Sequence, residues 1–423
     1  MNLKPLNNYR WWVCALIATA TAINYLDRQN LPIAIGEIRK TIEISDFEYG
    51  LINSLFLFAY GTMYAVGGRT IDLLGSKMGY AVMILWWSAA NIIHGLVSSV
   101  TGLGLARFLL GLGEGGGFPA SAKVVSEWFP QRERSIAFGI FNAGSSLGAV
   151  MAPPLLAAII SLANWRWTFI LSGLLGLGWV VLWYRMYSLP SNSRYSSSAE
   201  KDYINNGQSS AGVGKPQPSW LSYFNNRDVW TVILVKIFPD SAWYFFIFWL
   251  PKYLNDVRGL DIVSIGLYAW IPYAFAGIGS LLGGWLSSFL LQRNVSLAVS
   301  RKIPLGLAAA LLPASLLITS VSLPWAIVFF SMAMLGHQLY STIAQTLVTD
   351  LFPSQAVGTV TGLMGCLVTY GAMLFSVLIG HVIGESGYGP AFIIAGMLHP
   401  LGFILVLLLL KKDKFVRNDL ATI

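Results

Sequence analysis

Residues 126–139 read SEWFPQRERSIAFG, and residues 349–362 read TDLFPSQAVGTVTG. The two stretches align without a gap, and the same register places LGE at 112–114 on LGH at 335–337. A Phe-Pro dipeptide alone would mark only the end of a helix, because Pro interrupts helices wherever it occurs. The run of matches in one register predicts instead a chain built from two similar halves.

The composition is typical of a membrane protein. Of the 423 residues, 55% are hydrophobic and 11% are charged, with a mean hydropathy of +0.63. Soluble globular chains carry about 25% charged residues. The apolar runs are about 20 residues long and do not alternate with polar residues, which predicts membrane-spanning helices rather than barrel strands. Cys14 and Cys366 lie within such runs and imply no disulfide framework. The first run is expected to be an uncleaved helix.

The apolar runs number twelve, in two sets of six. They cover residues 10–30, 49–68, 79–97, 102–125, 136–160, 167–187, 229–253, 264–290, 303–321, 324–349, 357–383 and 389–410. The stretch between the sets is rich in Ser, Asn, Gly and Pro, so it reads as a flexible linker with room for one short helix. We therefore predict a first six-helix bundle over 1–187, a linker over 188–228, and a second bundle with a tail over 229–423.

The distribution of Lys and Arg predicts the orientation. The termini, the linker and alternate connections carry most of the basic residues, and the intervening connections carry few. Basic residues are retained on the cytoplasmic side, so both termini and the linker are predicted to be cytoplasmic. The net charge of +8 sits beside hydrophobic spans rather than on a basic module interleaved with aromatic residues. No nucleic-acid partner is predicted.

Two parallel copies of six spans are the plan of the major facilitator fold, whose binding site lies between the halves near the midplane. The loop GGRTIDLLGSKMG at 67–79 supports this fold. Gly68, Asp72, Gly75 and Lys77 match four positions of the facilitator signature G-x-x-x-D-R-x-G-R-K, which predicts a gate on the cytoplasmic side. Leu73 and Ser76 replace the two arginines of the signature, so a weakened charge relay is expected. The alternative is a helix-turn-helix corner with a solvated Asp.

Six charged residues lie inside the apolar runs. They are Asp27, Arg28, Arg107, Glu114, Lys236 and Asp240. A charge at the centre of a membrane helix costs about 2.5–3.5 kcal/mol on insertion scales, so these positions predict a functional site. Asn24, Asp27 and Arg28 are expected to share one face of their helix at i, i+3 and i+4. The alternative is that each carboxylate only neutralises a neighbouring cation, and it is stronger for Lys236 and Asp240.

The first four charges suggest a transport mechanism. Arg28 and Arg107 stay protonated and present planar forks suited to a carboxylate. Asp27 and Glu114 are the groups whose protonation can change, because burial raises the pKa of a carboxyl and a nearby arginine lowers it. Protonation of both would free the arginines to bind an anion, and proton loss after release would restore the ion pairs. This predicts proton-coupled import of an organic acid.

Several motifs resemble one known family. NYLDR at 24–28, ARFLLGLGEGGGFPAS at 106–121, WYFFIFWLPKYL at 243–254, SRK at 300–302 and GHQLYS at 336–341 look like the anion:cation symporter family of the major facilitator superfamily. Within it, the chain looks most like bacterial hexuronate transporters. Galactonate transporters and the vesicular glutamate and sialic acid carriers are more distant. The resemblance covers nearly the whole chain and is weaker in the linker and the last span.

The resemblance implies roles for individual residues. Those implied to contact the substrate are Tyr25, Arg28, Tyr60 and Arg107, and those implied to handle the proton are Asp27 and Glu114. Ser145 and Tyr370 fall where galactonate transporters have a glutamine and an asparagine, which argues against galactonate itself. His337 and Gln338 match a His-Gln pair of hexuronate carriers. A lone intramembrane histidine is often a core residue, but His337 lies at the pseudo-symmetric position to Glu114, and this register favours the cavity.

Other functions fit the sequence less well than a carrier does. An enzyme is not predicted, because the chain has neither HExxH nor a phosphate loop, and its four histidines are scattered. The run GLGEGGG lies inside a span without a preceding strand, so it favours close helix packing over dinucleotide binding. An anion channel is the rival from another class. Another organic anion, such as an aldonate, aldarate or sialate, is the alternative substrate.

The expected setting is the bacterial plasma membrane. We expect a monomer in the lipid bilayer that binds a small organic anion, with no cofactor, no metal and no catalytic residue. The coupling ion is predicted to be a proton, and the residues leave sodium as the alternative.

Overall fold

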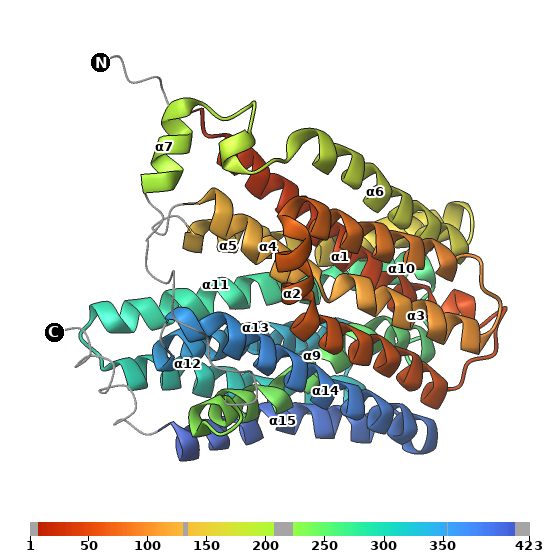
Figure 1. Cartoon of the computed structure of the whole chain (residues 1–423). Helices are drawn as coiled ribbons and strands as arrows, with labels where there is room; N and C mark the ends of the chain where they lie inside the picture. Colours follow the sequence, from red (N-terminus) through yellow and green to blue (C-terminus); the bar gives the residue numbers. More distant parts are fainter. Residues whose placement is uncertain (1–6, 130–133, 207–222, 353, 411–423) are drawn as a thin grey trace.

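The computed structural model describes residues 7–129, 134–206, 223–352 and 354–410. Within these ranges the chain is helical and contains no β-strand (Figure 1). Helices satisfy their own backbone N–H and C=O groups, which hydrocarbon cannot do. The all-helical class that the hydropathy predicts is therefore confirmed.

The first half of the chain contains six helical crossings. Its helices are α1 Tyr9–Ile38, α2 Asp46–His94, α3 Val100–Glu114, α4 Gly117–Trp128, α5 Arg134–Leu162 and α6 Trp165–Met186. α2 supplies two crossings, because the backbone at Gly75 takes a left-handed φ of 75° and interrupts the helix there. Glycine adopts this conformation without the strain of a Cβ. α3 and α4 are the two pieces of one crossing, separated at Gly115 and Gly116.

The second half repeats this plan after a short connection. The connection contains η1 Pro190–Asn192 and α7 Ser198–Asn206. The following helices are α9 Arg227–Asp256, α10 Ile262–Tyr268, α11 Trp270–Gln292, α12 Leu297–Leu311, η2 Leu312–Ser320, α13 Leu323–Leu351, α14 Ser354–Ser386 and α15 Tyr388–Leu409. α10 and α11 form one crossing, and α12 and η2 form another.

Length and composition agree with repeated passage through a membrane. Among the described residues, nine helical segments are long and apolar enough to span a bilayer. Three further crossings, α1, the second limb of α2 and the broken α3–α4 helix, bring the total to twelve. α1 and α3 carry the four intramembrane charges of the first half, Asp27, Arg28, Arg107 and Glu114. The chain is a multi-pass membrane protein.

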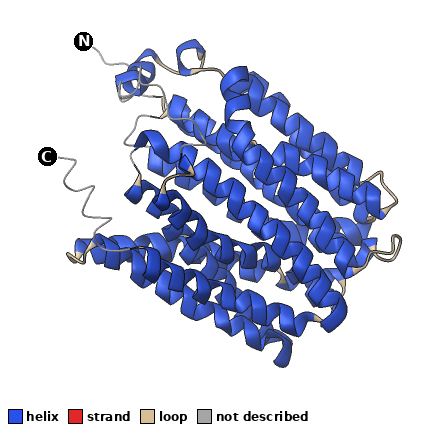
Figure 2. Cartoon of the chain, turned by 60° about the horizontal axis from the view of Figure 1, so that its bottom comes forward, coloured by secondary structure: helices blue, strands red, loops and turns tan. Residues whose placement is uncertain are grey.

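The two halves lie side by side along their lengths. The first half, red to yellow-green, forms one layer of Figure 1, and the second half, green to blue, forms the other. The view in Figure 2 shows the same long, roughly parallel helices from a different side. Contacts between the halves run along α2 and α14, along α1 and α9, and between α5 and the α10–α11 pair.

The halves are joined by charged and polar groups at one face of the molecule. We name the face where α1 begins and α15 ends the terminal face, and the other one the opposite face. At the opposite face the fully buried Lys252 of α9 lies 2.6 Å from the Asp46 carboxylate at the start of α2, and it also pairs with Asp256. Arg39 lies 3.7 Å from Asp46 and 3.6 Å from Asp256. The Tyr388 hydroxyl donates to Asp256 at 3.1 Å.

Hydrogen bonds continue this seam toward the middle of the molecule. The Tyr49 hydroxyl donates to the Phe248 carbonyl at 2.5 Å, and Ser376 Oγ donates to the Gly50 carbonyl at 3.2 Å. Within the described residues, the hydrogen bonds and ion pairs between the halves reach no further along α2 than Thr62. The bonded seam therefore closes the opposite face.

The short helix α7 is attached to the terminal face of the first bundle. Glu200 of α7 is fully buried. Its carboxylate accepts the backbone N–H groups of Tyr9 at 3.0 Å and Arg10 at 3.1 Å, and the Arg10 guanidinium at 2.9 Å. A carboxylate at a helix N-terminus satisfies free N–H groups and opposes the positive end of the helix dipole. The connection thus supplies the N-terminal cap that Asn8 does not provide.

Close packing of α2 and α14 at the opposite face predicts a way to open it. A Cβ at Gly50 would lie 2.7 Å from the Ser376 carbonyl oxygen and 3.1 Å from Gly380 Cα. Gly50→Leu should therefore force the two helices apart. Spin labels at Glu43 and Glu385, measured by double electron–electron resonance, should report a shift to longer distances.

Gly389→Leu is the control, because a Cβ at Gly389 meets no atom within 4 Å. An unchanged distance distribution in Gly50→Leu would show that this face is not held shut by the contact.

Candidate functional site

An ion pair inside the first bundle forms the centre of the candidate site. Arg28 of α1 donates to Glu114 Oε2 of α3 through Nε at 3.1 Å and through one terminal nitrogen at 2.9 Å. The two side chains are 3% and 0% exposed. α3 can approach because Gly111 lies against α2, where a Cβ would meet the Phe56 carbonyl at 2.5 Å. The glycine-rich run therefore serves close helix packing, as the sequence predicts.

Aromatic rings surround the Arg28 guanidinium. Its central carbon lies 4.8 Å from the Tyr25 ring, 4.7 Å from the Tyr60 ring and 5.4 Å from the Phe56 ring. The negative ring faces stabilise a cation by about 0.5–2 kcal/mol each, more when water is excluded. The structure thus brings Tyr25, Tyr60 and Arg28, all predicted to contact substrate, to one place.

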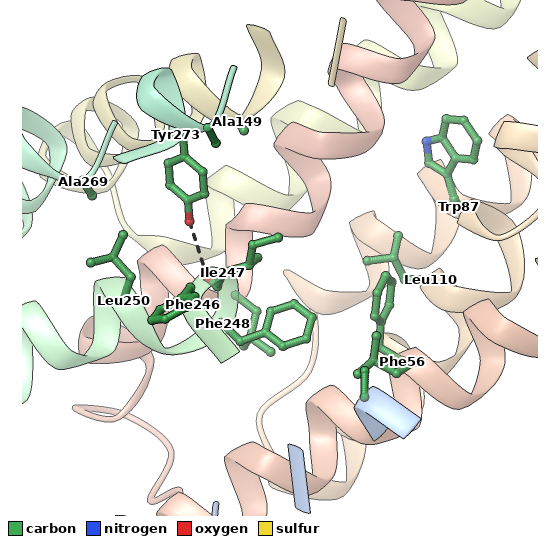
Figure 3. Close-up of a cluster of buried hydrophobic side chains, with 14 of the residues drawn as sticks. Phe56, Trp87, Leu110, Ala149, Phe246, Ile247, Phe248, Leu250, Ala269 and Tyr273 are labelled. Carbon is green, nitrogen blue, oxygen red and sulfur yellow. Dashed lines mark hydrogen bonds between the residues drawn. The ribbon is translucent and has the colours of Figure 1, made fainter. Parts of the chain in front are cut away.

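Arg107 of α3 lies beside this pair and differs from Arg28 in its partners. It is fully buried, and one terminal nitrogen donates to the Arg28 carbonyl at 3.0 Å. Its guanidinium lies 4.7 Å from the Phe56 ring and 5.8 Å from the Phe248 ring of α9. Figure 3 shows Phe248 directed toward Phe56 across the seam between the bundles.

Two nitrogens of Arg107, Nε and Nη1, have no hydrogen-bond partner among the described residues. Leaving a buried cation partly unbonded costs free energy that an anion would recover. The arrangement can therefore accept a carboxylate.

Asp27 points away from its neighbour Arg28. Asn91 Nδ2 in the second limb of α2 donates to Asp27 Oδ1 at 2.7 Å and to Ser172 Oγ of α6 at 2.6 Å. The expectation that Asn24, Asp27 and Arg28 share one face holds for Asn24, whose Oδ1 accepts from Arg28 at 3.2 Å. It is wrong for Asp27, because adjacent residues on a helix point about 100° apart. Asp27 lies within the first bundle, close to α6.

Sequence reasoning missed Asn91 and Ser172. Both are fully or almost fully buried. A polar residue in the apolar stretch 79–97 is the signal that could have drawn attention to Asn91, but Ser172 becomes relevant only when α6 is placed beside α2.

The remaining predicted substrate residues lie on three helices. Ser145 is on α5 of the first bundle, and the other residues are on α13 and α14 of the second bundle. His337 of α13 is buried, 3.1 Å from His399 of α15 through Nδ1 and Nε2, and it stacks on Trp243 with ring centroids 4.6 Å apart. These contacts place it in the interior of that bundle. Gln338, the next residue on α13, is half-buried.

Ser145 and Tyr370 have local partners. Ser145 Oγ donates to the Asn142 carbonyl of its own helix α5 at 2.6 Å. The Tyr370 hydroxyl is 2.8 Å from Thr62 Oγ1 of α2, and its ring stacks on Phe58, which is 44% exposed. The structure therefore places Tyr370 at the outer edge of the α2–α14 seam rather than beside Arg28.

The predicted gate lies at the terminal face, where Gly75 interrupts α2. Lys77 Nζ lies 5.7 Å from the Tyr184 ring, and the Lys77 carbonyl accepts from Trp183 Nε1 at 2.9 Å. Ser76 Oγ is 2.8 Å from the Tyr187 hydroxyl, which donates to Glu127 of α4 at 2.7 Å. A hydrogen-bonded chain thus stands where the signature has an arginine.

The side chain of Asp72 and the surroundings of Gly68 lie outside the described residues. Elsewhere in the described part of the chain, no three His, Cys, Asp or Glu side chains form a group that could hold a metal ion.

The Arg28–Glu114 pair predicts a pattern of stabilities. Glu114→Leu leaves a buried arginine without its carboxylate, which should lower the free energy of unfolding by about 3–5 kcal/mol. The double variant Arg28→Met/Glu114→Leu removes both charges and should recover most of that loss. Thermal unfolding of the detergent-solubilised protein measures the difference.

Glu37→Gln tests the exposed pair with Lys40, whose side chain is 69% exposed, and should change stability by no more than about 1 kcal/mol. A double variant as unstable as Glu114→Leu would contradict the energetic coupling of Arg28 and Glu114.

Comparisons with known proteins agree with this architecture. The chain matches the family model of the Major Facilitator Superfamily over residues 17–312 and 295–421. It is 33% identical over 416 residues to the hexuronate transporter of Escherichia coli strain K12, covering 97% of this chain and 96% of that protein. It is 34% identical over 312 residues to the galacturonate transporter of Dickeya chrysanthemi, covering 73% and 90%.

A solved structure shares the fold. The crystal structure of a bacterial homologue of the human lysosomal transporter Spinster, inward-facing and occupied, superposes with a TM-score of 0.67 at 20% identity, covering 98% of this chain and 97% of that chain. Together with the twelve crossings in two halves, these matches show that the chain is a carrier and not an enzyme, and that it belongs to the major facilitator superfamily, among relatives of the anion:cation symporter type.

Proposed function

We propose that this protein is a proton-coupled symporter that imports a sugar acid, a hexuronate such as glucuronate or galacturonate, by alternating access. The observation that carries the proposal is Arg107, a fully buried guanidinium with two nitrogens that lack a partner, beside an Arg28 whose charge is held by Glu114. The two nitrogens can donate to a carboxylate of the substrate. The relatives named for hexuronate and galacturonate transport supply the substrate class.

The substrate binds after a proton has entered. Protonation of Glu114 weakens its bond to Arg28. Arg28 and Arg107 can then donate charge-assisted hydrogen bonds to the substrate carboxylate. Tyr25 and Tyr60, whose rings lie over Arg28, offer hydroxyls and apolar faces to the sugar. After the substrate leaves, Glu114 loses its proton and pairs with Arg28 again. The carrier then returns to the outside without a bound substrate anion.

Asp27 is proposed as the second proton-handling residue. One of its oxygens is held by Asn91, and the other has no partner among the described residues. A proton on that second oxygen would remove a buried negative charge near Arg107 without breaking the bond to Asn91. The nearby positive charge of Arg107 would then be available to the substrate.

The proposed setting is the bacterial plasma membrane, with the terminal face in the cytoplasm. The excess of Lys and Arg on the connections of that face supports this orientation. The bonded seam at the opposite face supports a state in which the periplasmic side is closed.

The deciding experiment is uptake into proteoliposomes. Labelled glucuronate, galacturonate and gluconate are offered with an acidic outside and a neutral inside. A hexuronate should accumulate against its gradient, saturably, and a protonophore should abolish accumulation. A sodium gradient without a pH gradient should not replace it.

Equilibration without saturation or counterflow would identify a channel instead. Accumulation of another anion alone, such as glutamate or a phosphate ester, would overturn the hexuronate assignment.

Glu114→Gln separates coupling from binding. An amide cannot release a proton, so the variant should keep counterflow exchange of the hexuronate and lose pH-driven accumulation. Glu37→Gln, which changes an exposed carboxylate on α1, should retain both. Loss of exchange as well as accumulation in Glu114→Gln would assign this residue a purely structural role.

A further inference from the structure

A second buried ion pair lies in the other bundle, within a single helix. Lys236 and Asp240 of α9 are one turn apart, and the Lys236 ammonium contacts Asp240 Oδ2 and lies 3.2 Å from Ser341 Oγ of α13. The side chains are 6% and 14% exposed. Desolvating two charges costs several kcal/mol per ion, so a pair at this depth is weak evidence for a role in stability alone.

Along α9, steps of one turn lead from the pair to Phe248, which contacts the first bundle. Tyr244 follows Asp240 by one turn, and Phe248 follows Tyr244 by another. The Tyr244 and Phe248 rings are 5.8 Å apart, and Phe248 lies over Arg107. Tyr244 is close enough to interact electrostatically with both Arg28 and Asp240. Asp240 is likewise within reach of Tyr64 of α2. One tyrosine thus interacts electrostatically with a charged residue of each ion pair.

Asp240 has an unused acceptor. Its Oδ1 is buried and makes no hydrogen bond within the described part of the chain, although the other oxygen is bound to Lys236. A hydroxyl could donate to this oxygen, and the Lys236 ammonium, with Asp240 and Ser341 as its partners, has a third N–H left to give. A carboxylate would instead bring a second negative charge to Asp240. The pair therefore suits a neutral, hydroxyl-bearing group.

We propose that Lys236 and Asp240 form the second half of the substrate site, where they bind the hydroxyl-bearing end of a sugar monoacid and reject sugar diacids. This proposal rests on the proposed function, since it takes the substrate carboxylate to be held by Arg28 and Arg107. The site selects monoacids because a diacid would place its second carboxylate next to the negative charge of Asp240. The repulsion between the two carboxylates lowers the affinity for the diacid.

A matched pair of ligands tests this selectivity. A hexuronate and its aldarate differ in oxidation state at C1 alone. C1 is an aldehyde, which closes a hemiacetal ring, in the first and a carboxylate on an open chain in the second. Binding of glucuronate and glucarate, and of galacturonate and galactarate, is measured by isothermal titration calorimetry on the detergent-solubilised full chain. The wild-type protein should bind the hexuronate more tightly than its aldarate.

Asp240→Asn should raise the affinity for the aldarate relative to the hexuronate by about tenfold or more, because the repelling charge is gone. The double variant Lys236→Gln/Asp240→Asn removes both charges of the pair, so neither is left buried without its partner if Asp240→Asn alone fails to fold. It should show a smaller rise. Asp256→Asn is the control, because Lys252 and Asp256 form the same kind of pair on the same helix at the opposite face. Its affinity ratio should equal that of the wild type.

An unchanged ratio in both Asp240 variants, with hexuronate still bound by the wild type, would overturn this inference alone. A wild type that binds the aldarate as tightly as the hexuronate would also overturn it. A wild type that binds neither acid would remove the proposed function and this inference together.

Discussion

Hydrocarbon cannot solvate a charge, and this constraint organises the candidate site. Each ionised side chain at the centre of a membrane helix costs about 2.5–3.5 kcal/mol on insertion scales, so it must find a partner inside the protein. Arg28 finds Glu114 on another helix, α3, which packs closely on α2 because it presents Gly111 to the α2 backbone. The rings of Tyr25 and Tyr60 then cover the arginine. Among the described residues, two nitrogens of Arg107 make no hydrogen bond, which makes Arg107 the natural receptor for an anion brought in from water.

The two halves of the chain use buried ion pairs of different geometry. In the first bundle the partners come from different helices, α1 and α3, so a small relative movement or a single proton can separate them. In the second bundle Lys236 and Asp240 lie one turn apart on α9 and move together. An interhelical pair is suited to coupling, because its strength depends on helix positions and protonation. An intrahelical pair is suited to recognition, because it presents a fixed donor and acceptor. In the proposed cycle the pseudo-symmetric halves therefore have unequal tasks.

The sequence predicts the crossings well and the partners poorly. Twelve spans follow from length and hydropathy, because the bilayer fixes how many apolar residues a helix needs. The break at Gly75 falls within the signature loop, where its left-handed φ requires a glycine. The partner of Asp27 does not follow from the sequence. The adjacent Arg28 points elsewhere, and Asn91 comes near Asp27 only when α1 and α2 are packed. The partners of Tyr370 and Lys252 could not be predicted for the same reason. Each partner lies in the other bundle, so the contact depends on how the two bundles pack together.

α2 and α9 connect the candidate site to the closed face. α2 begins at Asp46, which Lys252 of α9 binds across the seam, and three to four turns later it places Tyr60 over Arg28. α9 carries Lys252 at that face and Asp240 deeper in the molecule, with Tyr244 and Phe248 between them on the side toward the first bundle. Both helices are continuous over these stretches, so each joins a residue of the candidate site to a residue of the Asp46–Lys252 pair. A carrier must not open to both sides at once. A substrate held between Arg28 on one bundle and Asp240 on the other would favour the closed seam through the helices that bind it, and would need no separate sensor at the surface.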